Sequence, residues 1–215
     1  MRAEIAMKRI EAIPGLSKSG KKLNGLFRLL TCRDLWYRAY EKIASNKGSM
    51  TPGVDGQTFD GFSLPKVEDI IAKVLAGKYE PTPVRRVYIP KPNGKLRPLG
   101  VPTVADRLVQ EVVRGILEVV YEPVFSPCSH GFRPGRSCHT ALKQISDVWQ
   151  GVKWLVEVDI KGFFDNIDHG TMMALLAQKI DDKRFLRLIN GFLKAGYLED
   201  WEFHETFRAC SITRS

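Results

Sequence analysis

The stretch WLVEVDIKGFFDNIDH, residues 154–169, decides the expected fold. Side chains of a β-strand alternate between two faces, so Val156 and Val158 can pack on one face while Asp159 projects from the other. The stretch therefore predicts a core strand that ends at the break formed by Lys161 and Gly162. A carboxylate at the end of such a strand adds little to stability. Asp159 is therefore either a solvated strand end or a ligand for something cationic.

Composition places the chain among globular proteins and restricts its location. The 215 residues are 44% hydrophobic and 27% charged, which is ordinary for a globular domain. No apolar run reaches the roughly 18 residues that span a membrane, and no targeting signal is evident at the start of the chain. Four scattered cysteines suit a reducing compartment better than a disulfide framework. The sequence predicts an intracellular protein without a membrane partner.

The charge balance points to a polyanionic partner. Lys and Arg number 33 against 24 Asp and Glu, for a net charge of +9. A basic excess of this size attracts nucleic acids and other polyanions, although a basic protein can also lack any such partner.

Apolar residues at helical spacing predict helices over most of the chain. Ser63, Thr103 and Asp168 are expected to cap helix N-termini, because each precedes an apolar periodic run. The expected helices occupy the region through about Asn46 and the ranges 63–77, 103–123, 168–180 and 182–195. A further helix is expected to follow the loop SPCSHGFRPGRSCHTAL and to stop at Gly151.

Residues 84–102 predict a β-hairpin that turns at Asn93 and Gly94, because two β-rich runs flank Pro-Asn-Gly. One interpretation is an exposed ribbon whose charges prevent edge-to-edge aggregation. The other is a clamp for phosphates, which the single sign of the charges and the stiff tip favour. The cations of the hairpin are Arg85, Arg86, Lys91, Lys95 and Arg97.

Asp159 and the basic hairpin together suggest phosphoryl or nucleotidyl transfer. That chemistry needs hard cations held by oxygen ligands, and cationic side chains on the phosphates. Hydrolase and P-loop interpretations lack their central motifs, since the sequence contains neither Gly-x-Ser-x-Gly nor Gly-x(4)-Gly-Lys-Ser/Thr.

Four blocks resemble the reverse transcriptases encoded by group II introns, also called intron maturases. The blocks are GSMTPGVDGQTF, PTPVRRVYIPKPNGKLRPLGVPTVADRLVQEVV, FSPCSHGFRPGRSCHTAL and VEVDIKGFFDNIDH, in the order of the family. The resemblance implies an α+β fold: right-hand polymerase fingers with a partial palm, mostly helical, with the basic hairpin and a short antiparallel sheet. It implies an N-terminal helical extension over 1–60, fingers over 61–152, a partial palm over 153–206 and a divergent tail over 207–215.

The resemblance also implies roles for individual residues. Asp159 and the carbonyl of Ile160 would bind the catalytic Mg²⁺ of the complete enzyme, and Phe164 would act as the gate against ribonucleotides. The implied triphosphate ligands are Lys91, Lys95 and Arg97, and the implied nucleic-acid contacts are Arg85, Arg86, Arg133 and Arg136. Implied partners are intron and template RNA, an RNA/DNA primer-template and a dNTP, in the cytoplasm of a bacterium or in an organelle.

The sequence departs from the family pattern after WEFHET, residues 201–206. The Tyr-Ala-Asp-Asp hairpin that supplies two further metal-binding aspartates does not occur in it. We therefore expect a fragment of an RNA-directed DNA polymerase with a role in splicing and retromobility, inactive by itself, whose open palm sheet allows a homodimer. The alternatives are a catalytically inactive RNA-binding module and a non-intron reverse transcriptase relative used in defence or in generating diversity.

Overall fold

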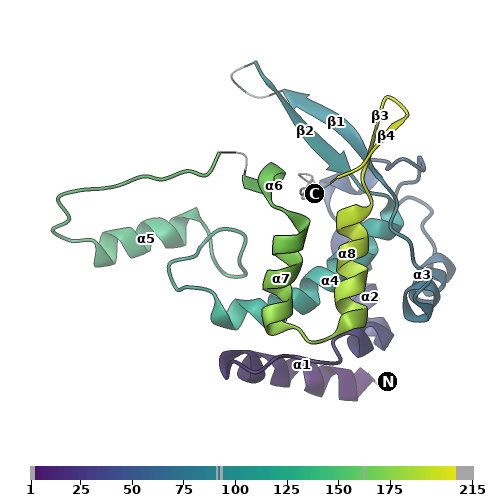
Figure 1. Ribbon diagram of the computed structural model, residues 1–215, viewed down its shortest axis with the longest axis horizontal. Helices are drawn as coiled ribbons and strands as arrows, with labels where there is room; N and C mark the ends of the chain where they lie inside the picture. The colour runs from purple at the N-terminus through teal and green to yellow at the C-terminus, as the bar shows by residue number, and fades with distance from the viewer. Residues whose placement is uncertain (1–2, 91, 93, 162, 207–215) are drawn as a thin grey trace.

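A mostly helical body carries a small sheet at one end in the computed structural model, which describes residues 3–90, 92, 94–161 and 163–206 (Figure 1). No helix in these residues is long and apolar enough to cross a membrane. The elements are α1 (Ala3–Lys18), η1 (Phe27–Thr31), α2 (Arg33–Ala44), η2 (Lys47–Met50), α3 (Leu64–Ala76), β1 (Val84–Pro90), β2 (Leu96–Val101), α4 (Val104–Tyr121), η3 (Glu122–Val124), α5 (Cys138–Val148), α6 (Phe163–Asn166), α7 (His169–Lys179), α8 (Lys183–Lys194), β3 (Tyr197–Glu199) and β4 (Glu202–His204).

Helix α4 lies at the centre of the core and packs against α1 and α2. The Thr103 hydroxyl accepts a hydrogen bond from the Asp106 backbone amide at 3.2 Å, so Thr103 caps the helix as the sequence predicts. Trp36 of α2 is fully buried, and its indole nitrogen donates to the Leu30 carbonyl at 2.8 Å. The apolar stripe of α4 is buried: Val104, Leu108, Val109, Val112, Val113, Ile116 and Val120.

The helix pair α7 and α8 is joined to the N-terminal part of the chain at Asp182. This buried carboxylate caps α8 by accepting from the Arg184 and Phe185 amides, each at 3.1 Å. Its other oxygen accepts from the Phe27 amide at 2.9 Å, 155 residues earlier. Two backbone bonds of 2.8 Å also join Leu23 to residues 179 and 181. Segments far apart in the sequence are therefore joined in one core.

The sheet is small and mixed, with the strand order β2-β1-β3-β4. The predicted hairpin is confirmed as the antiparallel pair β1 and β2, in which Val87 lies opposite Leu99. The expectation of a wholly antiparallel sheet is wrong, because β3 pairs with β1 in parallel and places Tyr197 opposite Val84. This pairing joins residues more than 100 positions apart, which no local pattern encodes.

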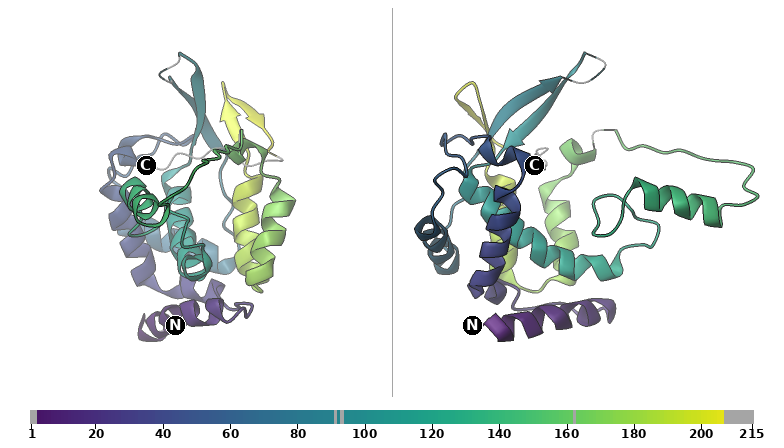
Figure 2. Two further views of the ribbon diagram at one scale, coloured as in Figure 1. Left: turned by 90° about the vertical axis from the view of Figure 1, so that its left-hand side faces the viewer. Right: turned by 180° about the vertical axis from the view of Figure 1, so that it is seen from behind.

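The predicted core strand at 154–160 is wrong as well. Residues 152–160 are neither helix nor strand, and Trp154 and Val156 are 87% and 83% exposed. A strand forms only when a neighbour accepts and donates its backbone hydrogen bonds, and no residue in the described ranges does so here. The segment runs with α5 as an arm that projects from the helical body (Figures 1 and 2). Helix α5 itself ends at Val148, three residues before the expected stop.

Candidate functional site

The base of the hairpin is fixed to α4 by Asp106. This buried carboxylate accepts from the Tyr79 hydroxyl at 2.7 Å, the Thr103 hydroxyl at 2.7 Å and the Thr82 amide at 3.2 Å. Burial raises the pKa of Asp106 above its ordinary value, and these hydrogen bonds oppose the rise. Because Thr82 lies two residues before β1, the contacts set where the hairpin leaves the body.

A second support comes from the GSMTPG block, residues 48–53. The buried Arg107 guanidinium donates to the carbonyls of Pro102 at 3.1 Å, Gly48 at 2.9 Å and Thr51. A Cβ at Gly53 would lie 2.7 Å from the Thr103 Cα, so this close approach requires glycine. The block is thus a structural wedge between the start of α4 and the base of the hairpin.

The two arginines at the hairpin base are engaged within the protein. Arg85 donates to the Pro52 carbonyl at 3.1 Å, which ties it to the same wedge. The Arg86 guanidinium lies 3.9 Å from the centre of the Tyr197 ring, where cation and ring attract. Both were expected to contact nucleic acid, and the structure places both among the groups that hold the sheet.

The outer part of the hairpin presents the exposed cations Lys95 and Arg97. Arg97 lies opposite Ile89 on the face that carries Val87 and Leu99. Lys91 and Asn93, assigned to triphosphate binding and to the turn, lie outside the described residues.

Arg133 organises the loop before α5. Its guanidinium binds both carboxylate oxygens of Glu122, at distances of 2.7–3.1 Å. It also donates to the carbonyls of Ser126 at 2.7 Å and Ser129 at 2.8 Å, and lies 5.3 Å from the Phe125 ring centre. The Arg133 bond is the main reason why the pKa of Glu122 falls below its ordinary value. With its side chain only 7% exposed, Arg133 is committed to this loop.

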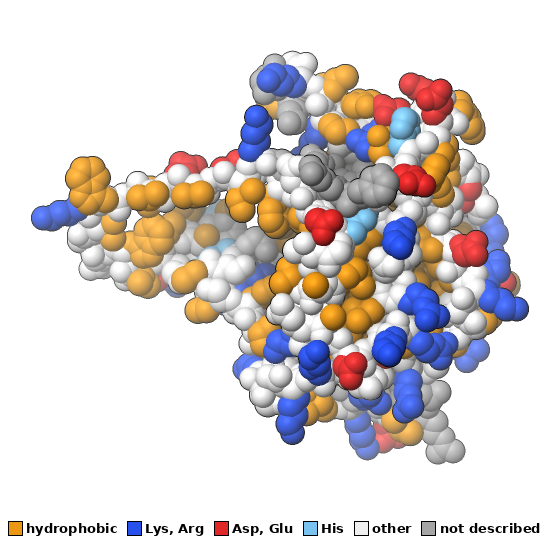
Figure 3. Space-filling view, in the orientation of Figure 1, with side chains coloured by type: hydrophobic (Ala, Val, Ile, Leu, Met, Phe, Trp, Pro, Cys, Tyr) orange, Lys and Arg blue, Asp and Glu red, His pale blue; other side chains and the backbone are white. Residues whose placement is uncertain are grey.

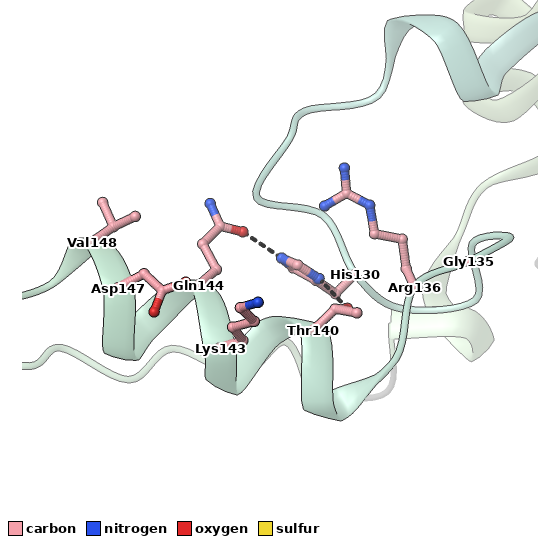
Figure 4. A pocket seen from close by; sticks show the side chains of 8 residues that line it. All are labelled: His130, Gly135, Arg136, Thr140, Lys143, Gln144, Asp147 and Val148. Atoms are coloured by element: carbon pink, nitrogen blue, oxygen red, sulfur yellow. Dashed lines mark hydrogen bonds between the residues drawn. The ribbon is translucent and has the colours of Figure 1, made fainter.

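Arg136 instead lines a pocket of about 360 Å³ beside α5 (Figure 4). One of its amino groups donates to the Pro127 carbonyl at 2.8 Å. The exposed Lys143 lines the same pocket, and Asp147 is the only carboxylate among its lining residues. The surroundings of Arg136 are therefore cationic, as a phosphate site requires.

His130 lines the same pocket, between the loop and α5. Its Nδ1 lies 2.8 Å from the Thr140 hydroxyl and its Nε2 lies 2.5 Å from the Gln144 side-chain oxygen (Figure 4). Both partners lie one turn apart on α5, so the histidine joins the loop to that helix. Only the folded structure shows that Lys143 and His130 belong with Arg136.

Asp159 and Ile160 lie in the exposed segment that leads back to α6 (Figure 1). No ion pair or hydrogen bond joins Asp159 to the hairpin cations in the ranges that the structure describes. Within those ranges no three His, Cys, Asp or Glu side chains gather to hold a metal ion. A single carboxylate does not fit a two-ion site, which needs several oxygen ligands between the ions. The side chain of Phe164 lies outside the described part.

Comparison with known proteins adds to this geometry. The sequence pattern of the family "Reverse transcriptase (RNA-dependent DNA polymerase)" matches residues 89–212. The group II intron-encoded protein LtrA of Lactococcus lactis is 55% identical over 85% of this chain, which covers 31% of that protein. An uncharacterized 91 kDa protein in the cob intron of Schizosaccharomyces pombe is 46% identical over 78% of the chain, covering 21% of its length. Nuclear intron maturase 1, mitochondrial, of Arabidopsis thaliana is 28% identical over 75% of this chain, which covers 25% of the length of that protein.

Proposed function

We propose, from the premise that the chain belongs to the reverse transcriptase (RNA-dependent DNA polymerase) family, that it forms part of a group II intron-encoded enzyme that copies RNA into DNA. The chain spans about a third or less of the length of the curated relatives described above. The proposal therefore assigns to it the N-terminal extension (1–60), the fingers (61–152) and the first part of the palm (153–206). The observation that carries it is that the exposed cations and Asp159 lie inside the matched region.

The contacts at the base of the hairpin suggest that the cations have two different roles, binding phosphates and positioning the fold. Lys95 and Arg97 would bind the triphosphate of a dNTP, because both lie on the outer, exposed part of the hairpin. Lys91, which lies outside the described residues, is proposed as a third ligand from the family resemblance alone. Arg136 would bind a phosphate of template or intron RNA at the pocket beside α5. We assign Arg85, Arg86 and Arg133 a positioning role, since each holds a protein group and none of them lines the pocket where Arg136 lies.

In the complete enzyme, Asp159 and the Ile160 carbonyl would contribute ligands to Mg²⁺, and Phe164 would lie against the sugar of the incoming nucleotide. The described residues supply only this part of the metal site, so we derive no chemical step from it. We place the enzyme in the cytoplasm of a bacterium or in an organelle, where intron RNA is available.

A chimera tests this function. Residues 23–206 would replace the matching segment of the Lactococcus protein, and primer extension on an RNA template would be compared with the unmodified protein. We expect the chimera to extend the primer and Asp159→Asn to abolish extension. Glu157→Gln, two residues earlier in the same exposed segment, is the matched control and should retain it. Equal extension by the Asp159→Asn chimera and its parent would exclude the proposed role.

A second function concerns the chain by itself, as an RNA-binding module without catalysis. The exposed Arg97 and Lys143 and the cationic pocket favour it, whereas the single carboxylate Asp159 does not support a two-ion reaction. We expect the isolated chain to bind single-stranded RNA and to extend no primer with Mg²⁺ or Mn²⁺. Extension that depends on Asp159 would refute this second function while leaving the first intact.

A further inference from the structure

The first turn of α4, the GSMTPG block and β1 hold one another at the base of the hairpin. Asp106 accepts from the Thr82 amide, just before β1, at 3.2 Å. Arg107, the next residue of α4, donates to two carbonyls of the GSMTPG block. Arg85 of β1 donates to a third carbonyl of that block, that of Pro52, at 3.1 Å. We call these contacts the base junction. Because each of the three parts holds the other two, the hairpin cannot tilt without breaking one of them.

The hairpin extends from the base junction as a lever. In β2 the three residues nearest α4 are buried, whereas Leu96 and Arg97 at the other end are exposed. Arg97 lies four residues from Val101, which corresponds to about 13 Å at the rise of a β-strand. Over that length, a rotation of about 5° at the base moves Arg97 by roughly 1 Å. Lys and Arg side chains lie on this outer part of the hairpin (Figure 3), so a small tilt at the base displaces them.

We propose that Asp106 and Arg107 are positioning residues for the incoming nucleotide. This role rests on the proposed function, in which Lys95 and Arg97 bind the triphosphate of a dNTP. Asp106 and Arg107 are buried at the base of the hairpin, so they act on the nucleotide through the angle at which the hairpin leaves the helical body. That angle matters because misplacing a binding group by about 1 Å can cost roughly a hundredfold in rate.

The contacts of Asp106 predict which substitution keeps this role. One carboxylate oxygen accepts from the Tyr79 hydroxyl, and the other accepts from the Thr82 amide and the Thr103 hydroxyl. Asparagine can retain all three bonds, since its oxygen accepts twice and its amide donates to the Tyr79 hydroxyl. Asp106→Ala instead leaves the Thr82 amide without this acceptor. Arg107→Lys keeps the charge, but a single ammonium does not replace the planar guanidinium that holds several carbonyls.

Gly53 offers a second way to open the base junction, without deleting a hydrogen-bonding group. A Cβ at this position would lie 2.7 Å from the Thr103 Cα and 3.0 Å from the Pro102 carbonyl oxygen. In Gly53→Ala the block must therefore move away from the start of α4. Gly115 lies in the middle of α4, where an added Cβ meets no atom of the described residues within 4 Å. Gly115→Ala is therefore the matched control.

Nucleotide kinetics in the chimera with the Lactococcus protein test this role. We expect Asp106→Ala, Arg107→Lys and Gly53→Ala to raise the KM for dNTP about tenfold, while the affinity for the RNA template changes by less than about twofold. Asp106→Asn and Gly115→Ala should behave like the parent. Ile116→Ala removes a buried side chain further along the same helix and controls for a loss of stability alone, so it should leave the KM for dNTP unchanged.

A distance measurement on the chain by itself tests the hairpin angle without any activity. Spin labels at Leu96→Cys on the hairpin and Glu41→Cys on α2, both exposed positions, would report this distance by pulsed electron paramagnetic resonance. The background replaces by serine every cysteine except the buried Cys32. We expect one narrow distance distribution in the parent and in Asp106→Asn. Asp106→Ala and Gly53→Ala should shift or broaden it, and circular dichroism would verify that each variant is folded.

Two results would overturn the positioning role. The first is a distance distribution that neither Asp106→Ala nor Gly53→Ala changes, because the base junction would then not set the hairpin angle. The second is an active chimera in which these variants keep the KM of the parent for dNTP, or in which Ile116→Ala raises it equally. An inactive parent chimera would count against the proposed function instead, and the distance measurement would still decide whether the base junction positions the hairpin.

Discussion

Removing the cations of the outer hairpin and of the pocket beside α5 should flatten the salt dependence of RNA binding, whereas removing Arg85, Arg86 and Arg133 should not. The first variant combines Arg97→Ala, Arg136→Ala and Lys143→Ala. These side chains lie on the outer hairpin and in the pocket beside α5, where phosphates can reach them. Each phosphate contact releases condensed counterions, so losing a contact lowers the dependence of affinity on salt.

The number of phosphate contacts removed sets the expected change in the slope. Each contact to single-stranded RNA contributes about 0.7 to the slope of log affinity against log salt, so three contacts contribute about 2. A second variant replaces Arg85, Arg86 and Arg133 by Ala. Because these guanidinium groups already hold the Pro52 carbonyl, the Tyr197 ring and Glu122, we expect its slope to change by less than about 1.

Fluorescence anisotropy of a short single-stranded RNA, titrated between about 50 and 200 mM salt, measures both slopes. The matched control removes three exposed cations from one helix, α8: Lys183→Ala, Arg187→Ala and Lys194→Ala. Circular dichroism of each variant checks that the fold is intact. The assignment fails if the α8 variant flattens the slope as much as the first variant, or if the first variant leaves the slope unchanged.

Three further predictions concern stability, pH and nucleotide choice. Asp182→Ala should lower the free energy of unfolding by about 2–4 kcal/mol, because it removes the cap of α8 and the buried hydrogen bond to the Phe27 amide. Urea unfolding measures this loss, and the exposed Asp181→Ala is the control. Arg133 lowers the pKa of Glu122 below its ordinary value of 4.5. The ion pair therefore stabilises the folded protein fully above pH 4.5, and this contribution is lost as the pH falls through the lowered pKa. Protease sensitivity of residues 125–136 should therefore rise on acidification, and in Glu122→Gln that pH dependence should vanish. In the active chimera, Phe164→Val should admit ribonucleotides while Phe163→Val should not; equal sugar selectivity of parent and Phe164→Val would remove the gate assignment.

Local signals predicted the elements whose stability is local. The capping residues Thr103 and Asp168 each accept a hydrogen bond from a backbone amide three residues later, as expected. Gly77 ends α3 in the left-handed conformation, and the hairpin forms where two β-rich runs flank Pro-Asn-Gly. In each case the residues that decide the element are its own neighbours in the sequence.

Features that depend on distant partners could not be predicted in this way. Apolar residues do alternate along 154–160, but alternation alone does not make a strand. The described chain supplies no neighbouring strand to pair with this segment. The parallel contact of β1 with β3 and the short strand β4 carry no periodic signal of their own. The spacing in the GFRPGRS block likewise gave no hint that Arg133 turns inward to Glu122 while Arg136 faces a pocket.

The hydrogen bond between Asp182 and the Phe27 amide can form only after most of the chain has been synthesised. Phe27 leaves the ribosome long before its partner, because 155 residues separate the two. At about 5 to 20 residues per second, that interval lasts roughly 8 to 30 seconds. During it, the Phe27 ring, which is buried in the finished fold, lacks the guanidinium of Arg184 in α8 that lies 4.0 Å from its centre in the structure. Chaperone capture of nascent chains should therefore be strongest for those that end before residue 182, and should fall once α8 has emerged.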